Sequence, residues 1–218
     1  MSVVVPTYQG IGLIERCLDA LLGQVGEVLD IIVVDDGSTD ATCEAVTARS
    51  RVRLFRRSHA GVAAARNVGI DAAQAPFVGF CDQDDEWLPE KAHTQAEHLR
   101  THPDVDVVLC QADVQLDIDE RPKWLGDDQR GRRGGVPPLS GLFRSEVLAR
   151  VGGFVGTEYG NEDFDLLVRL RESGARFEVA DDVLMRRHVH DRNASHAFGT
   201  YERGLVDVMR RRVGRARS

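Results

Sequence analysis

The sequence predicts an α/β fold with a mostly parallel, Rossmann-like sheet flanked by helices. Short β-branched runs alternate with segments of helical apolar spacing through the first 110 residues. Most of these runs are apolar on both faces, as in strands of a parallel sheet that helices cover on both sides. The chain has 218 residues and an ordinary composition, 42% hydrophobic and 29% charged, which suits one large domain with a full core.

The first half is expected to alternate strands with helices. The apolar or β-branched runs predict strands at 3–5, 31–34, 52–55, 77–80 and 105–110. Helical spacing or alanine-rich composition predicts helices at 11–22, 42–49, 61–75 and 88–102. Pro6 ends the first strand, and Ser38 or Asp40 stands near the N-cap of the second helix.

The second half is less regular. Residues 116–138 are polar, charged and rich in Gly and Pro, which predicts a long mobile loop of the functional or disordered kind. Order returns over 139–151. A helix is expected at 162–173, with Gly174 at its C-terminal end, and a last strand at 179–185.

Charge and cysteine content exclude some classes of function. A net charge of −7 argues against general nucleic-acid binding. The last nine residues carry five arginines and no acid, and this basic C-terminus either touches anionic lipid or is a frayed, solubilising end. Four separated cysteines contain no CxxC pair. With no signal peptide and no apolar run of about 20 residues, we expect a cytoplasmic protein, at most peripheral to the inner face of the membrane.

The acidic turn after strand 77–80 is the most informative segment. Asp82, Asp84 and Asp85 follow the expected strand directly. Ligand sites of open α/β sheets form at the carboxyl ends of strands. Because clustered carboxylates repel one another, a divalent cation is their usual partner, and oxygen ligands suit Mg²⁺ or Mn²⁺. The alternative is a solvated acidic turn.

Four other groups of residues have both a chemical and a structural interpretation. Asp35 and Asp36 end the second strand at the same edge, where they either bond a base or ribose or form an Asx turn. Arg66 follows a glycine that opens a helix, a position for binding phosphate or simply a surface one.

The other two groups lie in the second half. Glu162 and Asp163 begin a helix, as a general base would or as the helix dipole favours. His188 or His190 is either a metal ligand or a surface or hydrogen-bonded histidine.

Taken in order, these segments resemble the family 2 glycosyltransferases, which are inverting enzymes of the GT-A fold. The matching segments are 3–8, 34–40, 61–69, 82–89, 151–154, 162–170 and 190–195. They cover nearly the whole chain in the family's order, and the ordered set is far more specific than any single motif.

The resemblance implies a role for each matching residue. Those expected to bind the nucleotide sugar are Pro6, Thr7, Tyr8, Asp36, Arg66, Asp82, Gln83 and Asp84. Within this set, Pro6, Thr7 and Tyr8 would line the base and Asp36 would bond its polar edge. Asp82 and Asp84 match the D-x-D positions. The metal ligands would be Asp84, Asp85 and His190, with Asp85 an alternative to Asp84. Asp163 would be the catalytic base, beside Glu162.

The resemblance also implies an activity, namely the metal-dependent transfer of a sugar from a nucleotide-diphosphate sugar, by preference a UDP-sugar, to an acceptor hydroxyl. The acceptor would be a glycan, lipid carrier, peptide or natural product. The Gln-x-x-Arg-Trp motif of processive members is absent, which favours single additions. We expect one domain: a nucleotide-binding half (1–110), an acceptor-binding half (111–200) and a helical basic tail (201–218). A homodimer stays open. The alternatives are a non-catalytic nucleotide-sugar-binding protein and a nucleotidyltransferase.

Overall fold

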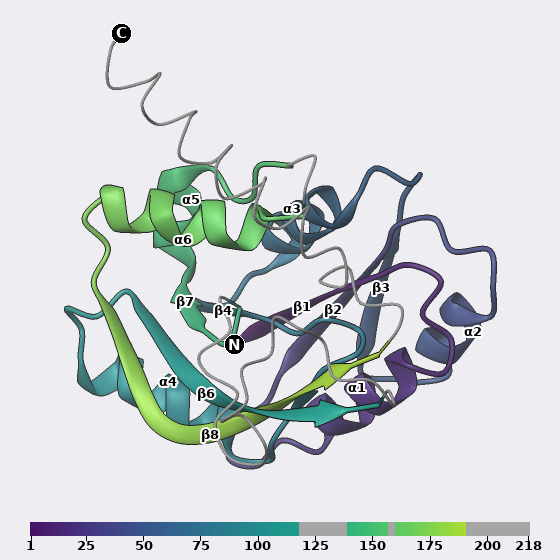
Figure 1. Ribbon diagram of the computed structural model, residues 1–218, viewed down its shortest axis with the longest axis horizontal. Coiled ribbons are helices and arrows are strands. Elements are labelled where there is room, and N and C mark those ends of the chain that lie inside the picture. Colours follow the sequence, from purple (N-terminus) through teal and green to yellow (C-terminus); the bar gives the residue numbers. More distant parts are fainter. Residues whose placement is uncertain (118–138, 157–159, 191–218) are drawn as a thin grey trace, which may run out of the picture.

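The computed structural model describes residues 1–117, 139–156 and 160–190. Within these ranges one sheet carries all the strands, in the order β3-β2-β1-β4-β7-β6-β8-β5 (Figure 1). The strands are β1 (Ser2–Thr7), β2 (Asp30–Asp35), β3 (Val52–Arg56), β4 (Phe77–Phe80), β5 (Glu86–Trp87), β6 (Val107–Leu116), β7 (Leu142–Arg144) and β8 (Phe177–Val189). The helices are α1 (Ile14–Leu22), α2 (Thr42–Thr47), α3 (Val62–Ala72), α4 (Lys91–Thr101), α5 (Ser145–Val151) and α6 (Glu162–Glu172).

The sheet is mixed, but most of its strands share one direction. β1 pairs in parallel with β2 and β4, and β2 with β3. β7 lies antiparallel between β4 and β6, so β6 and its parallel partner β8 keep the direction of β4. Of the described strands, β7 and β5 run the other way. The expected α/β fold with a mostly parallel sheet is confirmed, and the carboxyl ends of β1, β2 and β4 meet at one edge.

Helices cover both faces of the sheet because successive side chains of a strand point to opposite sides. Val4 of β1 packs with Leu148 of α5 and Leu166 of α6. Its neighbours Val3 and Val5 pack in a separate cluster with the buried side chains of α1. Figure 1 shows the resulting layers, with α3, α5 and α6 on one side of the sheet and α1 and α4 on the other.

Several boundaries differ from the sequence expectations. The two-residue strand β5 was not expected, and it delays the start of α4 from residue 88 to Lys91. β6 and β8 extend beyond the expected 105–110 and 179–185 because they pair with each other as far as Leu116 and Val189. Most of the loop expected at 116–138 and the whole basic C-terminus lie outside the described residues.

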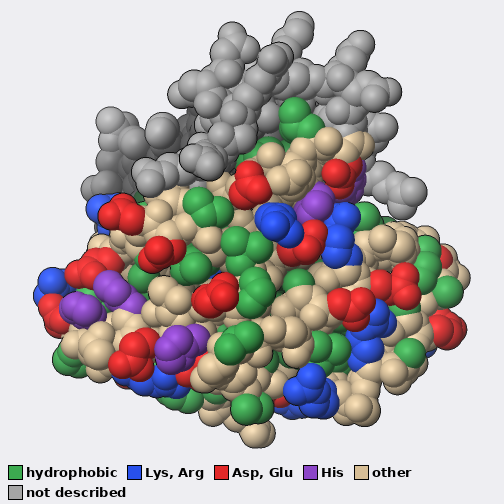
Figure 2. Space-filling model, turned by 90° about the horizontal axis from the view of Figure 1, so that it is seen from below, with side chains coloured by type: hydrophobic (Ala, Val, Ile, Leu, Met, Phe, Trp, Pro, Cys, Tyr) green, Lys and Arg blue, Asp and Glu red, His purple; other side chains and the backbone are tan. Residues whose placement is uncertain are grey.

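The surface of the described part is mixed in charge. On the face that Figure 2 shows, acidic and basic side chains are interspersed with hydrophobic ones, and the described residues seen there form no broad basic patch. No helix in the described part of the chain combines the length and apolar character that a bilayer-spanning segment requires.

Candidate active site

The acidic turn after β4 is tied to the loop after β1 through Gln83. Its side-chain Oε1 accepts hydrogen bonds from Thr7 Oγ1 at 2.6 Å and from the backbone N–H of Tyr8 at 3.1 Å. The Gln83 amide also donates to the backbone oxygen of Tyr8 at 3.3 Å. Pro6 does not end the first strand as expected: it is buried within β1, which continues to Thr7, and it pairs with Val34. The structure therefore brings together Thr7, Tyr8 and Gln83, three of the residues expected to bind the nucleotide.

Asp84 and His190 meet at the end of the sheet. His190 Nε2 lies 3.0 Å from Asp84 Oδ2. Burial raises the pKa of Asp84 and the neighbouring Asp82 carboxylate raises it further, whereas His190 acts in the opposite direction. A carboxylate of the acidic turn and the imidazole of the residue that follows β8 thus converge, as the expected metal site requires.

Asp85 is the most deeply buried acid of the turn, with 9% of its surface exposed. Its Oδ1 accepts the backbone N–H of His188 at 3.3 Å. Burial raises the pKa of Asp85 well above its ordinary value, and the charges of Asp84 and Asp82 add to this, while Arg187 opposes it. An ionised Asp85 is therefore costly in this position unless positive charge is supplied nearby.

Arg66 joins the acidic turn to the start of α6. This arginine of α3 is 4% exposed. Its Nη2 donates to Asp82 Oδ1 at 2.7 Å and its Nη1 to Glu162 Oε1 at 3.1 Å. Burial lowers the pKa of Arg66, but the charges of Asp82, Glu162 and Asp163 outweigh this and raise it. Two motifs that lie 80 residues apart are thus held by one guanidinium.

Asp163 lines a small cavity beside this bridge. The cavity has a volume of about 40 Å³ and is lined by Phe80, Asp82, Asp85, Leu139, Asp163, Met185 and Arg187. Asp163 Oδ1 accepts the backbone N–H of Phe164 at 2.7 Å. Burial raises the pKa of Asp163, Arg66 opposes the rise, and Glu162 adds to it. A carboxyl with a raised pKa at a cavity wall has the properties of a general base.

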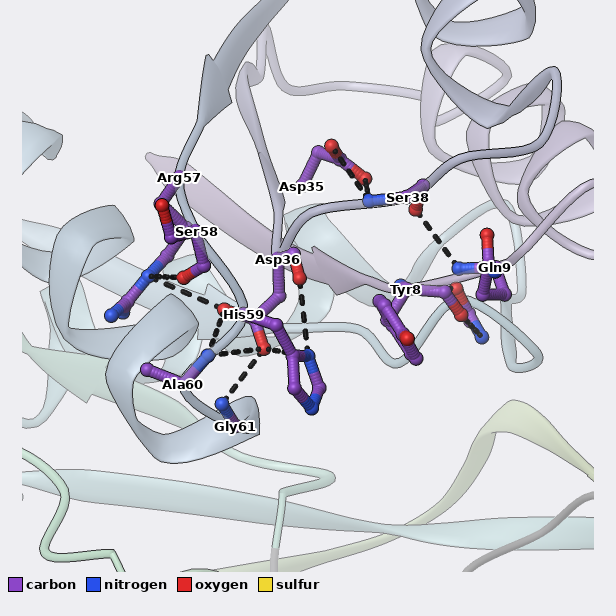
Figure 3. A network of polar contacts seen from close by, with 11 residues as sticks. Tyr8, Gln9, Asp35, Asp36, Ser38, Arg57, Ser58, His59, Ala60 and Gly61 are labelled. Carbon is purple, nitrogen blue, oxygen red and sulfur yellow. Dashed lines mark hydrogen bonds and ion pairs between the residues drawn. The ribbon is translucent and has the colours of Figure 1, made fainter.

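Asp36 forms a separate network at the end of β2 (Figure 3). Its carboxylate accepts the backbone N–H groups of Ala60 and Gly61, and it contacts the side chains of Arg57 and His59. The ring of His59 lies beside that of Tyr8, with 4.3 Å between centroids. Asp35, by contrast, accepts the backbone N–H of Ser38, three residues on, at 3.2 Å, a local turn contact that is one residue longer than the expected Asx turn.

The residues present fit a divalent cation in chemistry. Oxygen ligands with an imidazole suit Mn²⁺ and Mg²⁺, which usually keep waters and substrate phosphates in their shell. Among the described residues, however, no three His, Cys, Asp or Glu side chains converge closely enough to form a cation site by themselves. Asp84 and His190 would therefore supply only part of the shell of a bound cation.

Sequence reasoning did not assign roles to two residues of this region, Arg187 and His59. Arg187 lines the cavity, and its only sequence signal is its position in a basic stretch just before the late histidines. His188, the other histidine considered for the metal site, instead contacts Glu86 at 2.6 Å and Asp117 at 2.9 Å, contacts that depend on β5 and on the full length of β6. His59 lies beside Tyr8, and the only signal for it was that both residues follow parallel strands.

Curated relatives identify the family. A family model described as glycosyl transferase family 2 matches residues 2–147. The chain is 37% identical, over an alignment of 241 residues, to YibD, an uncharacterized glycosyltransferase of Escherichia coli K12, covering 96% of this chain and 69% of YibD. An uncharacterized glycosyltransferase of Nostoc sp. PCC 7120 is 32% identical over 171 residues, covering 69% of this chain and 52% of that protein.

Solved structures share the fold. Staphylococcus aureus TarS, residues 1–349 in complex with UDP-GlcNAc, has a TM-score of 0.75 and 22% identity, covering 90% of this chain and 60% of that one. The mannosyltransferase PcManGT of Pyrobaculum calidifontis, in complex with GDP-Man and Mn²⁺, has a TM-score of 0.75 and 24% identity, covering 97% and 63%. The chain therefore spans little more than three fifths of these structures. With the fold, the ordered motifs and these relatives in agreement, the chain belongs to glycosyltransferase family 2 and has the GT-A fold.

Proposed function

We propose that this protein is an inverting, metal-dependent glycosyltransferase. It moves one sugar at a time from a nucleotide-diphosphate sugar to an acceptor hydroxyl. The observation that best supports this is the shared cavity: Asp163, the expected base, and Asp82 and Asp85 of the acidic turn line the same space. A direct displacement of the nucleoside diphosphate by the acceptor hydroxyl needs a base and a donor-binding turn that share one space in this way.

Asp163 supplies the base in this mechanism. Its carboxylate takes the proton of the acceptor hydroxyl as the hydroxyl oxygen forms a bond to the anomeric carbon. The bond from that carbon to the nucleoside diphosphate breaks on the opposite face, so the configuration inverts. A raised pKa makes Asp163 a stronger base than an ordinary aspartate. Arg66 holds Glu162, the residue before Asp163, through a hydrogen bond to its carboxylate.

Asp84, Asp85 and His190 are the residues that would hold manganese (Mn²⁺) or magnesium (Mg²⁺). The raised pKa values of Asp84 and Asp85 support this, because a cation nearby would offset both the burial and the repulsion between carboxylates that raise them. When bound, such an ion supplies a Lewis acid that offsets negative charge on the leaving diphosphate.

The donor would lie along the edge formed by β1, β2 and β4. Thr7, Tyr8 and Gln83 are tied together there, and Asp36 and Arg66 flank them. UDP is the favoured nucleotide, although the solved structures of the same fold hold either UDP-GlcNAc or GDP-Man. The acceptor side would be built from residues 111–200.

A thermal-shift panel tests the proposal. UDP-, GDP- and dTDP-sugars are each added with Mn²⁺, with Mg²⁺ or with EDTA, because a ligand that binds only the folded state raises its apparent stability. We expect a metal-dependent rise in Tm with one nucleotide class, and slow release of the matching nucleoside diphosphate on prolonged incubation. No shift and no release with any donor would overturn the proposal. A shift that EDTA leaves unchanged would overturn its metal dependence.

A further inference from the structure

The imidazole of His188 is held between two carboxylates beside the acidic turn. His188 is the last residue but one of β8, and its side chain is 8% exposed. Its Nε2 lies 2.6 Å from Oε1 of Glu86 in β5. Its Nδ1 lies 2.9 Å from Oδ2 of Asp117, the first residue after β6. Because both ring nitrogens have a partner, the imidazole is fixed in one orientation.

Arg16 of α1 approaches the same two carboxylate oxygens. The ends of β6 and β8 lie beside α1 (Figure 1), and Arg16 Nη1 is 4.0 Å from Asp117 Oδ2. Arg16 Nε is 3.3 Å from Glu86 Oε1, an ion pair without a hydrogen bond at that nitrogen. Each carboxylate oxygen therefore faces one nitrogen of His188 and one of Arg16. These four side chains form a closed ring of contacts, the Arg16–His188 ring.

The Arg16–His188 ring is attached to both acids at the end of the acidic turn. Arg16 Nη2 donates a hydrogen bond to the backbone oxygen of Asp84 at 3.3 Å. On the other side of the ring, the backbone N–H of His188 donates to Asp85 Oδ1 at 3.3 Å. Glu86, which belongs to the ring, follows Asp85 directly in the chain. The ring thus holds the main chain of one candidate metal ligand and the side chain of the next.

Strand pairing alone holds this corner of the sheet over only a few residues. β5 has two residues, and its pairing with β8 ends at Glu86 and Arg186. The pairing of β8 with β6 ends at Val189. His190, which contacts Asp84, follows just beyond both pairings. Contacts across the Arg16–His188 ring therefore help to set where the end of β8 lies relative to the acidic turn.

We propose that Arg16 and His188 are positioning residues that hold Asp84, Asp85 and His190 in the arrangement that binds Mn²⁺ or Mg²⁺. This deepens the proposed function and rests on it. Arg16 offers only N–H donors and cannot be a ligand itself, and both nitrogens of His188 are directed at ring carboxylates. Contacts of this kind behind metal ligands typically contribute a factor of about 10–100 to metal affinity.

The test measures how much Mn²⁺ the protein needs to bind a nucleotide. Binding of UDP and of GDP to the full chain is measured by calorimetry in EDTA and at a series of Mn²⁺ concentrations. We expect Arg16→Met to raise the half-saturating Mn²⁺ concentration about tenfold and to leave nucleotide affinity in EDTA unchanged. Arg16→Lys keeps the positive charge and should recover part of the loss.

Arg49→Met is the matched control. Arg49 also pairs with an acid of α1, because its Nη2 lies 2.9 Å from Asp19 Oδ1, but it has no printed contact with the acidic turn. Its replacement should change neither the Mn²⁺ requirement nor nucleotide affinity in EDTA.

Two further variants test whether the ring acts as a unit. His188→Gln should also raise the Mn²⁺ requirement, and Arg16→Met should add little to it, because coupled residues are not additive. If Arg16→Met does not fold, Asp117→Asn replaces it. The Asp117 side chain is 42% exposed, so this variant is a milder change, and a smaller rise in the same direction is expected.

The outcomes separate this inference from the proposed function. An unchanged Mn²⁺ requirement in Arg16→Met, beside a wild type whose nucleotide binding depends on Mn²⁺, overturns the inference alone. Equal weakening of nucleotide binding with Mn²⁺ and in EDTA also overturns it, since that is a general structural effect. A wild type that binds neither nucleotide, or binds equally well with Mn²⁺ and in EDTA, overturns the proposed metal dependence as well.

Discussion

Asp163 is the single residue on which the proposed chemistry depends most. It faces the cavity, and burial raises its pKa. Asp163→Asn keeps the shape of the side chain and an acceptor for the N–H of Phe164 but removes the base. We expect turnover to fall at least ~10²-fold while donor affinity changes little, since a positioned base contributes about 10²–10⁴. Steady-state and donor-binding measurements check this, with exposed Asp181→Asn as control; full activity in Asp163→Asn would remove the assignment.

The pH dependence of turnover follows from the same residue. Because the pKa of Asp163 is raised, the base is lost by protonation at a pH above the ordinary aspartate value of about 3.9. Turnover should therefore fall as pH falls through this raised value. Glu162→Gln removes a neighbouring negative charge and frees Arg66, and both effects lower the pKa of Asp163. The acid limb of the kcat profile should move to lower pH, and a limb that stays in place or moves up contradicts this.

The acidic turn illustrates the conflict between stability and function in one element. The folded state raises the pKa of Asp85, so it holds this proton more tightly than the unfolded chain. Stability should therefore fall as pH rises between the ordinary and the raised pKa.

Asp85→Asn removes this decline and keeps an acceptor for the N–H of His188. Without metal at neutral pH, we expect its Tm to exceed that of the wild type, by about 2–4 °C for each kcal/mol gained. Mn²⁺ should reduce this difference in Tm between Asp85→Asn and the wild type. Exposed Asp71→Asn serves as control, and an unchanged or lower Tm for Asp85→Asn at neutral pH would count against the argument.

Elements with strong local patterns could be predicted from the sequence, whereas elements defined by distant partners could not. The run 77–80 coincides with β4, and 31–34 and 52–55 lie within a residue of β2 and β3. β5 has two residues and exists only because it pairs with β8, almost a hundred residues later. Such a pairing leaves no local periodicity, so a short stretch of sequence around β5 gives no signal for the strand.

Helix α3 packs on β1 through a glycine. A Cβ added at Gly69 would lie 2.2 Å from Val4 Cγ1. Gly69→Ala should therefore destabilise the protein by about 1–3 kcal/mol through overpacking, more than the roughly 0.5–1 kcal/mol that alanine gains in a helix. Gly156→Ala is the matched control, because a Cβ there meets none of the described atoms within 4 Å. Urea unfolding measures the free energy of unfolding of both variants. Equal values for Gly69→Ala and Gly156→Ala would show that the α3–β1 contact relaxes without cost.

At the scale of the whole molecule, the order of motifs predicts which residues gather at the sheet edge but not what joins them. β-strand ends in a parallel sheet bring Asp36 and Asp82 to one edge by topology alone. Arg66 lies between Asp82 and Glu162 because α3 brings it within reach of the start of α6. The sequence equally allowed a surface arginine at this position. Asn67, the next residue of α3, donates through Nδ2 to the backbone oxygen of Phe154 and accepts the backbone N–H of Phe154 through Oδ1, so α3 carries a second link to the second half of the chain.

Arg66 is thus expected to couple the acidic turn to α6 energetically. Its side chain and that of Glu162 are 5% and 8% exposed, so removing one partner strands a buried charge, at a cost of about 3–5 kcal/mol. Removing both is cheaper per residue, because the remaining Asp82 side chain is 40% exposed and water can solvate it.

A double-mutant cycle with Arg66→Met and Glu162→Gln, followed by urea unfolding, measures this coupling. We expect the double variant to lose about 0.5–3 kcal/mol less stability than the summed losses of the two single variants. Additive losses would mean that Arg66 contributes to each side separately and that the two motifs are held together by packing alone. A coupling of the expected size, together with a turnover loss in Arg66→Lys at nearly wild-type stability, would instead tie the geometry of the base to the guanidinium fork, which lysine cannot reproduce.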